Sequence, residues 1–242
     1  MNNLIIVESE NDKYFIESFI EYLNLKNIEV DNPICNVLEF NCLGGLNNLK
    51  NKLRDIRFDD YDKIGIILDA DDVGIEGRID FINQALKEVC SDVNLTEINK
   101  FEYSKELDVE IACYITNVNG KGELETLLRK VKSKESVYAD CLESWKECLE
   151  KNGKPLNQKE FDKIWVSYYL KFDTCIGRDK KQKFKKCANE LKQNPKNQYE
   201  IETNLQSNEY TIKKDIWDFE HNCLSDLKEF LSLFKSLSQT IV

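Results

Sequence analysis

Short apolar runs alternate with amphipathic segments through the first half of the chain. The runs are rich in Leu, Ile and Val and have strand length, at 4–7, 36–40, 63–68 and 109–115. Between them apolar residues recur every three or four positions, which predicts helices over 12–25, 46–56 and 75–89. Alternating strands and helices predict an α/β fold with a mainly parallel sheet, flanked by helices on both faces. The run at 63–68 is apolar on both faces and is expected at the centre of the sheet.

Beyond Gly120 the pattern becomes helical. The predicted helices cover 123–131, 137–150, 158–170, 180–191 and 223–237. Residues 192–214 are polar, and we expect a long loop there. The organisation we expect is an α/β core over residues 1–130 and a helical C-terminal extension over residues 131–242, packed on that core.

Composition indicates a globular, reduced protein. The chain has 242 residues, of which 41% are hydrophobic, and contains no apolar run long enough to span a membrane. It starts with a strand followed by charges, unlike a secretory signal peptide. The nine cysteines are odd in number and form no Cys-x-x-Cys pair. We expect reduced, mostly buried thiols and a cytoplasmic location.

Charge is divided unevenly between the two halves. Residues 1–120 carry 11 Lys and Arg against 24 Asp and Glu, whereas residues 121–242 carry 23 against 20. The second half contains a basic stretch that could bind a phosphate backbone: Arg178, Lys180, Lys181, Lys183, Lys185 and Lys186. A solvated helix face is an equally good interpretation of this stretch.

Carboxylates follow two of the predicted strands directly. Glu8 comes after the first strand, and Asp69 and Asp71 come after the strand at 63–68. Open α/β sheets place their chemistry at the carboxyl ends of the strands. A carboxylate cluster there suits a hard divalent cation such as Mg²⁺ or Mn²⁺, which would also relieve the mutual repulsion. The alternatives are a surface carboxylate in a loop for Glu8, and helix capping for Asp71 or Asp72.

A third acidic segment, residues 120–125, follows the strand at 109–115. It adds Glu123 and Glu125, which could also be the acidic first turn of a helix. Its glycines are too few and badly spaced for a phosphate-cradling loop, which excludes Walker and Rossmann dinucleotide motifs. His221 is the only histidine, so catalysis by a Ser-His-Asp triad would depend on it alone.

These motifs resemble the Toprim domain of topoisomerases, bacterial primases and OLD-family nucleases. Residues 6–9, Ile-Val-Glu-Ser, resemble the topoisomerase form, and the spacing Glu8-x3-Asp12 resembles the primase and nuclease form. Residues 122–128 are similar to the Gly-x-Leu-Glu segment of small stand-alone Toprim-like proteins. Residues 162–169 and 217–234 resemble later parts of those proteins. The chain has no topoisomerase cleavage domain, primase zinc motif or ATPase motif.

The resemblance implies a Toprim/Rossmann-like core and metal-dependent hydrolysis of phosphodiesters in nucleic acid. Glu8, Asp69 and Asp71 would hold Mg²⁺ or Mn²⁺, with Glu125 and either Asp72 or Glu123 completing a second site. Lys163 is the candidate for stabilising charge on the scissile phosphate. The resemblance also implies a role in antiviral defence against phage. A separate ATPase or another defence-system subunit would be the partner, and no membrane is involved.

Two other functions remain open at this point. The chain could be a catalytically silent Toprim-fold module that binds a partner protein, or a nucleotidyltransferase using the same carboxylates. Metal-dependent cleavage would distinguish a nuclease from the silent module. A requirement for a nucleoside triphosphate would distinguish the nucleotidyltransferase.

Overall fold

The computed structural model describes residues 2–34, 45–173, 198–203, 209–214 and 216–235. The fold is α/β, as the alternating pattern predicts. The chain divides into two compact units. The first unit comprises Met1–Leu124 and Asn222–Val242, and the second comprises Glu125–His221. Each is described by itself.

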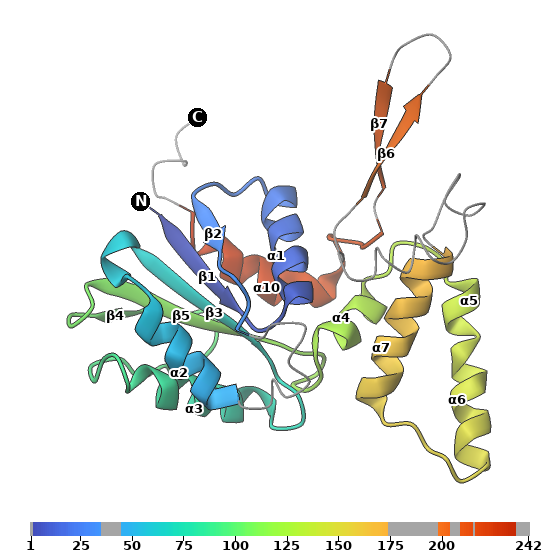
Figure 1. The fold of residues 1–242 in the computed structure, drawn as a ribbon, viewed down its shortest axis with the longest axis horizontal. Helices are drawn as coiled ribbons and strands as arrows, with labels where there is room; N and C mark the ends of the chain where they lie inside the picture. The colour runs from blue at the N-terminus through green and yellow to red at the C-terminus, as the bar shows by residue number, and fades with distance from the viewer. Residues whose placement is uncertain (1, 35–44, 174–197, 204–208, 215, 236–242) are drawn as a thin grey trace. The chain divides into compact units, whose positions relative to one another are not determined.

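A five-stranded sheet forms the centre of the first unit. Its strands lie in the order β2-β1-β3-β5-β4, with β3 in the middle (Figure 1). Neighbouring strands are parallel except β4, which pairs antiparallel with β5 at one edge. The strands are β1 (Asn3–Val7), β2 (Ile28–Val30), β3 (Lys63–Asp69), β4 (Glu102–Ser104) and β5 (Val109–Thr116). The expected central position of β3 is confirmed.

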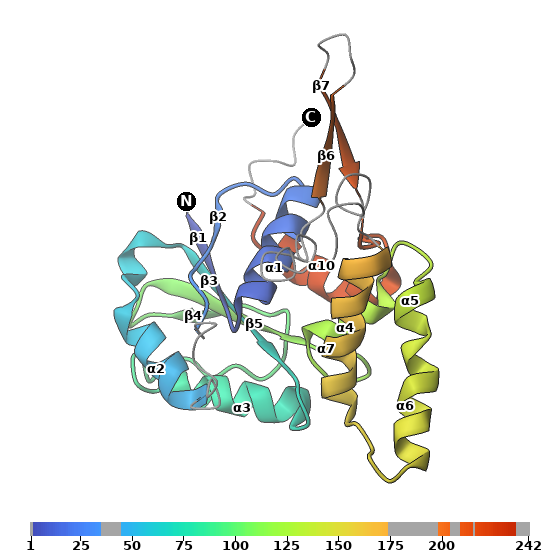
Figure 2. The same cartoon turned by 45° about the vertical axis from the view of Figure 1, so that its right-hand side comes forward.

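Helices cover both faces of this sheet. Side chains alternate along a strand, so Leu4 and Ile6 of β1 join the core beneath α2 and α3. Helices α1 and α10 lie on the opposite face, as the two views show (Figure 2). The helices of this unit are α1 (Glu10–Tyr22), α2 (Gly45–Asp55), α3 (Gly74–Leu86) and α10 (Ser225–Ser232), with 3-10 turns at Phe58–Asp60 and Asn222–Leu224.

Helix α10 belongs to the first unit, whereas we expected residues 131–242 to form one extension. Phe230 of α10 and Phe234, two residues beyond its end, fill the space that Gly65 leaves on β3. Tyr114 of β5 packs against Phe230, with ring centroids 5.7 Å apart. The Lys63 ammonium group donates to the Leu233 carbonyl at 2.7 Å. The sheet therefore needs residues from the end of the chain to cover this face, and the first boundary falls after Leu124 rather than 130.

Replacing Gly65 by Ala should destabilise the first unit. A Cβ at this position would lie 2.7 Å from Cζ of Phe234 and 2.8 Å from Cζ of Phe230, closer than carbon atoms pack. Overpacking of this kind costs about 2 kcal/mol of unfolding free energy. Urea denaturation followed by far-UV circular dichroism measures it. Gly77→Ala, the same change on helix α3, should alter the unfolding free energy by less than about 1 kcal/mol.

The double variant Gly65→Ala/Phe234→Leu makes the packing argument specific. Leu lacks the ring atom that meets the new Cβ, so the pair should be less destabilised than the two single effects added together. Additive losses would contradict a direct clash between the two positions.

The second unit is largely helical and contains a β-hairpin. Its apolar centre includes Trp165, Tyr169 and Trp217, with successive ring centroids 5.3 Å apart. The Tyr169 hydroxyl donates to the Ile216 carbonyl at 2.8 Å. Its elements are α4 (Leu124–Lys130), which begins at the boundary, α5 (Val137–Asp140), α6 (Leu142–Lys151), α7 (Gln158–Tyr168), a π-helical turn at Tyr169–Asp173, β6 (Gln198–Thr203) and β7 (Glu209–Lys214).

Several element predictions need correction. The segment 192–214, expected to be a loop, contains antiparallel strands β6 and β7. Each has only two apolar residues, two positions apart, and the surrounding polar residues made this alternation hard to recognise. The helix expected over 137–150 is interrupted at Cys141. Strands β2 and β4 were missed because each has only three residues. The strand expected at 36–40 and the helix expected at 180–191 lie outside the described residues.

The described cysteines are free thiols in different surroundings. Cys90 and Cys113 are buried, Cys141 and Cys148 are exposed, and Cys223 is intermediate. Burial raises the pKa of the Cys113 thiol to about 12. Reduced thiols were expected, although fewer of these five are buried than we predicted. No helix in the described part of the chain has both the length and the apolar character needed to cross a bilayer.

Candidate functional site

Glu8 and Asp69 lie together at the carboxyl ends of two neighbouring parallel strands. β1 and β3 pair in parallel with Val7 opposite Ile67, so both strands end at the same edge of the sheet. The Glu8 carboxylate accepts a hydrogen bond from the backbone N–H of Asp69, with 3.4 Å between Oε2 and N. The parallel-strand rule predicts this proximity, and the structure places the two residues accordingly.

The chain after β5 reaches the same edge. The backbone N–H of Ala70 donates to the Thr116 carbonyl at 2.9 Å, next to the end of β3. The backbone N–H of Leu124 donates to Oδ1 of Asp69 at 3.0 Å. Glu123 precedes that donor and is only 3% exposed. Sequence segments 69–71 and 120–124 therefore meet at one place, as their positions after strands β3 and β5 require.

A tight turn fixes the loop after β5. Asn119 and Gly120 both have positive φ values, 57° and 85°, which is the conformation that an Asn-Gly pair favours in a two-residue hairpin. The Asn117 side chain accepts from the Gly120 N–H at 2.9 Å. Asp71 and Gly122 then exchange two backbone hydrogen bonds, of 2.8 and 3.1 Å. These bonds hold the backbone of Asp71 in position.

The side chain of Asp71 forms an ion pair with Arg78 of α3. Asp72 is exposed in the turn before that helix. The capping alternative does not apply to either, because the residue before α3 is Val73 and no side-chain hydrogen bond caps the helix. The structure thus brings Glu8, Asp69 and Asp71 to the ends of neighbouring strands and the loops that follow them, but it pairs the Asp71 carboxylate with the Arg78 guanidinium.

The predicted ligands suit a hard divalent cation by chemistry, since all are carboxylates. Within the ranges that the structure describes, however, no group of three or more His, Cys, Asp or Glu side chains is arranged to hold a metal ion. Glu8 and Asp69 are adjacent, whereas Asp71 would have to exchange Arg78 for the cation. The chemistry of these carboxylates therefore suits a metal site, but the Asp71 carboxylate is engaged in an ion pair with Arg78.

Asp12 has a structural role. Its carboxylate accepts from the Ser9 N–H at 2.8 Å and from the Ser9 hydroxyl at 2.6 Å. The Ser9 hydroxyl in turn accepts from the backbone N–H of Asp12, which completes a capping box at the start of α1. The spacing Glu8-x3-Asp12 is therefore explained by the start of the helix, and it fixes the direction in which the chain leaves Glu8.

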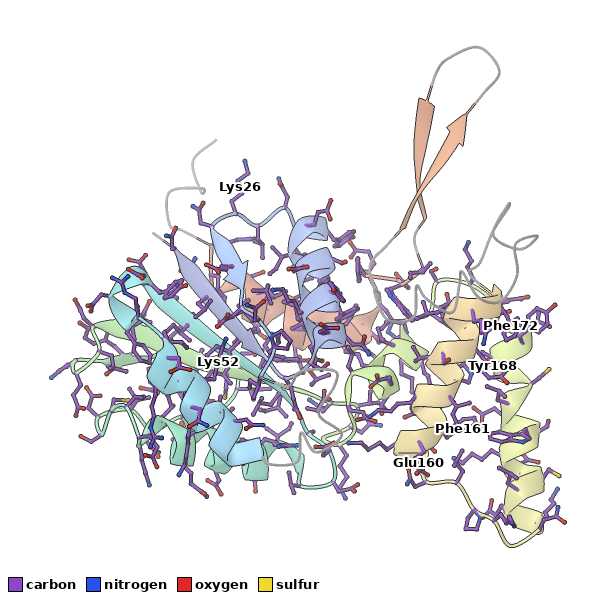
Figure 3. All side chains as sticks on the ribbon, viewed as in Figure 1. Lys26, Lys52, Glu160, Phe161, Tyr168 and Phe172 are labelled. Carbon is purple, nitrogen blue, oxygen red and sulfur yellow. The ribbon has the colours of Figure 1, made fainter. Side chains whose placement is uncertain are left out.

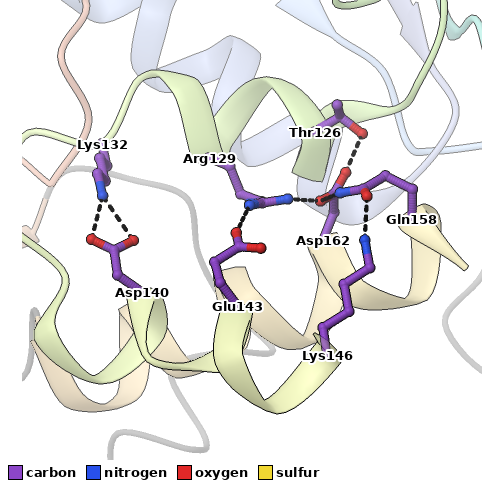
Figure 4. A network of polar contacts seen from close by, with 8 residues as sticks. All are labelled: Thr126, Arg129, Lys132, Asp140, Glu143, Lys146, Gln158 and Asp162. Carbon is purple, nitrogen blue, oxygen red and sulfur yellow. Dashed lines mark hydrogen bonds and ion pairs between the residues drawn. The ribbon is translucent and has the colours of Figure 1, made fainter. Parts of the chain in front are cut away.

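Glu125 and Lys163 belong to the second unit. Glu125 lies in the first turn of α4, and Lys163 lies on an exposed position of α7. The residue before Lys163, Asp162, is buried and accepts from Thr126 and Gln158, each at 2.7 Å, and from Arg129 (Figure 4). This network connects α4 with α7 and fixes how α7 is rotated about its own axis, and so which side Lys163 is on.

The aromatic residues of α7 and of the π-helical turn that follows it divide into two groups. Trp165 and Tyr169 are buried, so these two are core residues. Tyr168 is 38% exposed, so it is not a core residue. It packs on Phe172 with ring centroids 5.2 Å apart, at the end of the helical segment (Figure 3). The predicted basic stretch Arg178, Lys180, Lys181, Lys183, Lys185 and Lys186 lies outside the described residues.

A comparison with family models identifies the chain's relatives. The model of the family described as "Protein of unknown function (DUF3226)" matches residues 2–235. The chain belongs to this family. The match extends from β1 to the end of α10, so it includes both units and every described element. Searches of curated proteins and of solved structures gave no match.

Sequence reasoning missed Arg78. Its signal is weak, because an Arg on the predicted helix 75–89 of an acidic segment is most simply a solvated charge. The contact depends on the turn at Ala70–Gly74, where Asp71 takes a φ of 48°. Strand and helix periodicities carry no information about such a turn, so only the three-dimensional structure relates Arg78 to the acidic motif.

Proposed function

We propose that this chain is a Toprim-type, metal-dependent phosphodiester hydrolase acting on nucleic acid. The observation that carries the proposal is the position of Glu8 and Asp69 at the carboxyl ends of β1 and β3, in hydrogen-bond contact. Two acidic side chains at adjacent parallel strand ends lie where open α/β sheets bind their ligands. Their repulsion costs free energy that a bound cation would offset.

Glu8, Asp69 and Asp71 would hold one Mg²⁺ or Mn²⁺, and Glu125 with Asp72 or Glu123 would serve a second. A cation bound there would supply Lewis-acid stabilisation of charge on the phosphoryl oxygens. The protein's own contribution is orientation. Backbone donors at Asp69 and Leu124 fix the carboxylates of Glu8 and Asp69 before any ligand binds.

The wider biological role follows from the Toprim resemblance. We propose a cytoplasmic effector in defence against phage that works with a separate ATPase or another subunit. Lys163 would stabilise charge on the scissile phosphate, and the basic stretch at 178–186 would bind backbone phosphates. A silent module that binds a partner protein is the principal alternative, and the Asp71–Arg78 ion pair is compatible with it.

Cleavage by the purified chain is the direct test. We expect Mn²⁺ or Mg²⁺ to support cleavage of at least one member of a panel of single-stranded DNA, double-stranded DNA, RNA and tRNA. Chelation with EDTA should stop the reaction and added Mn²⁺ should restore it, because the carboxylates cannot stabilise phosphoryl charge by themselves. Gel electrophoresis of end-labelled substrates measures the products.

The outcomes separate the alternatives. Cleavage that survives EDTA contradicts the metal-dependent mechanism. Failure to cleave any substrate with either metal, together with a stable complex with another protein, supports the silent module. A strict requirement for a nucleoside triphosphate, with incorporation rather than cleavage, supports the nucleotidyltransferase.

A further inference from the structure

Arg78 places a positive charge inside the acidic site. Its Nη2 contacts Oδ2 of Asp71, and the two side chains are 14% and 25% exposed. The guanidinium carbon lies 5.5 Å from the centroid of the Phe81 ring, which covers the side chain on α3. Partial burial strengthens an ion pair relative to one in open solvent.

The surroundings allow this pair to break without moving the backbone. Two hydrogen bonds to Gly122 hold the main chain of Asp71, so its carboxylate can change partner by side-chain rotation alone. Arg78 has further donor capacity, because its buried Nε has no hydrogen-bond partner among the described residues. A guanidinium whose Nε is buried without a partner is only partly satisfied by one carboxylate.

We propose that Arg78 is a phosphate-binding residue that Asp71 holds until a divalent cation takes that carboxylate. This inference rests on the proposed function, since it needs Asp71 to bind a cation. A cation and a guanidinium repel each other when they share one carboxylate, so binding of the first weakens the hold on the second. The planar, fork-like guanidinium is well suited to a phosphate, so Arg78 released from Asp71 would bind a backbone phosphate of the substrate.

The proposal predicts opposite effects of one substitution. In Arg78→Gln, the cation no longer competes with a guanidinium for Asp71, so Mn²⁺ should bind about tenfold more tightly. Titration of the full-length protein with Mn²⁺, followed by electron paramagnetic resonance of the free ion, measures this affinity. Arg57→Gln is the matched control, because Arg57 is exposed in the same unit and pairs only loosely with Asp60 at 3.5 Å. It should change Mn²⁺ affinity by less than about twofold.

The second measurement is affinity for a phosphate backbone. With Ca²⁺ saturating the site, short labelled single-stranded DNA and RNA oligonucleotides should bind Arg78→Gln at least about fivefold more weakly than wild type. Arg78→Lys keeps the charge and should recover part of the loss. Partial unfolding would weaken both metal and oligonucleotide binding, so tighter Mn²⁺ together with weaker oligonucleotide binding cannot come from a damaged fold.

Each result decides something different. Equal or weaker Mn²⁺ binding by Arg78→Gln overturns the competition for Asp71, and unchanged oligonucleotide affinity overturns the phosphate role. In both cases the proposed hydrolase survives if the wild-type chain still binds Mn²⁺ and cleaves its substrate. If wild type binds no Mn²⁺ at all, the proposed function fails, and this inference fails with it.

Discussion

Glu8→Gln should lower metal-dependent cleavage by about a thousandfold while leaving the fold intact, since the loss of one preorganised electrostatic group commonly costs this much. Gln keeps an oxygen that can accept from the Asp69 N–H, so the local geometry is preserved. It removes one negative charge from a cluster in which carboxylates repel one another. The thermal unfolding temperature should therefore stay the same or rise, whereas activity is lost. Asp69→Asn should behave in the same way.

Matched controls make the result specific to position. Glu21→Gln removes the same charge from an exposed position near the end of α1, and Asp80→Asn does so on α3. Both should retain wild-type cleavage rates. A Glu8→Gln protein that still cleaves at close to the wild-type rate would rule out Glu8 as a ligand. A variant that loses its fold along with its activity would show that Glu8 has a structural role instead.

Asp162→Ala should destabilise the second unit by about 3 kcal/mol, the typical loss when one member of a buried ion pair is removed. The Asp162 side chain is fully buried and accepts from Arg129, Thr126 and Gln158. Removing it leaves Arg129 with its more exposed partner Glu143 and leaves two further donors without their acceptor. Asp162→Asn keeps the shape and one acceptor oxygen, so its loss should be smaller.

Tryptophan fluorescence can follow this unfolding selectively. The chain has three tryptophans, and all of them, Trp145, Trp165 and Trp217, lie in the second unit. Asp140→Asn is the control, because Asp140 pairs with Lys132 at an exposed position (Figure 4). It should cost less than about 1 kcal/mol. Equal effects of Asp162→Ala and Asp140→Asn on the urea midpoint would contradict a central role for the buried carboxylate.

The sequence predicts the parts of this fold that rest on long, regular patterns. β1, β3 and β5 have five to eight residues and almost wholly buried side chains, so their apolar runs stand out. The contact between Glu8 and Asp69 follows from that same pattern, because parallel strands end at one edge of the sheet. The role of these two residues in catalysis stays a prediction.

The features that the sequence did not predict depend on single contacts. Arg78 meets Asp71 only because a turn with a positive φ lies between them. The place of α10 depends on one residue without a side chain, Gly65, which creates room for two phenylalanine rings. The first contact depends on the geometry of a turn and the second joins positions far apart in the chain, and neither periodicity nor composition indicates either of them.

The position of α10 also constrains the order in which the chain can fold during synthesis. The sheet of the first unit leaves the ribosome early, but the helix that covers Gly65 follows only after the whole second unit has been made. Contacts between Asn3 and Phe234 span nearly the full chain, and contacts of such long range form slowly. Until then α1 is the only helix that the structure describes on this face, and the part of β3 and β5 around Gly65 and Tyr114 stays uncovered, which is a condition that favours aggregation or chaperone binding. The second unit is a continuous segment and needs no residues from the end of the chain, so it can become compact before the first is complete.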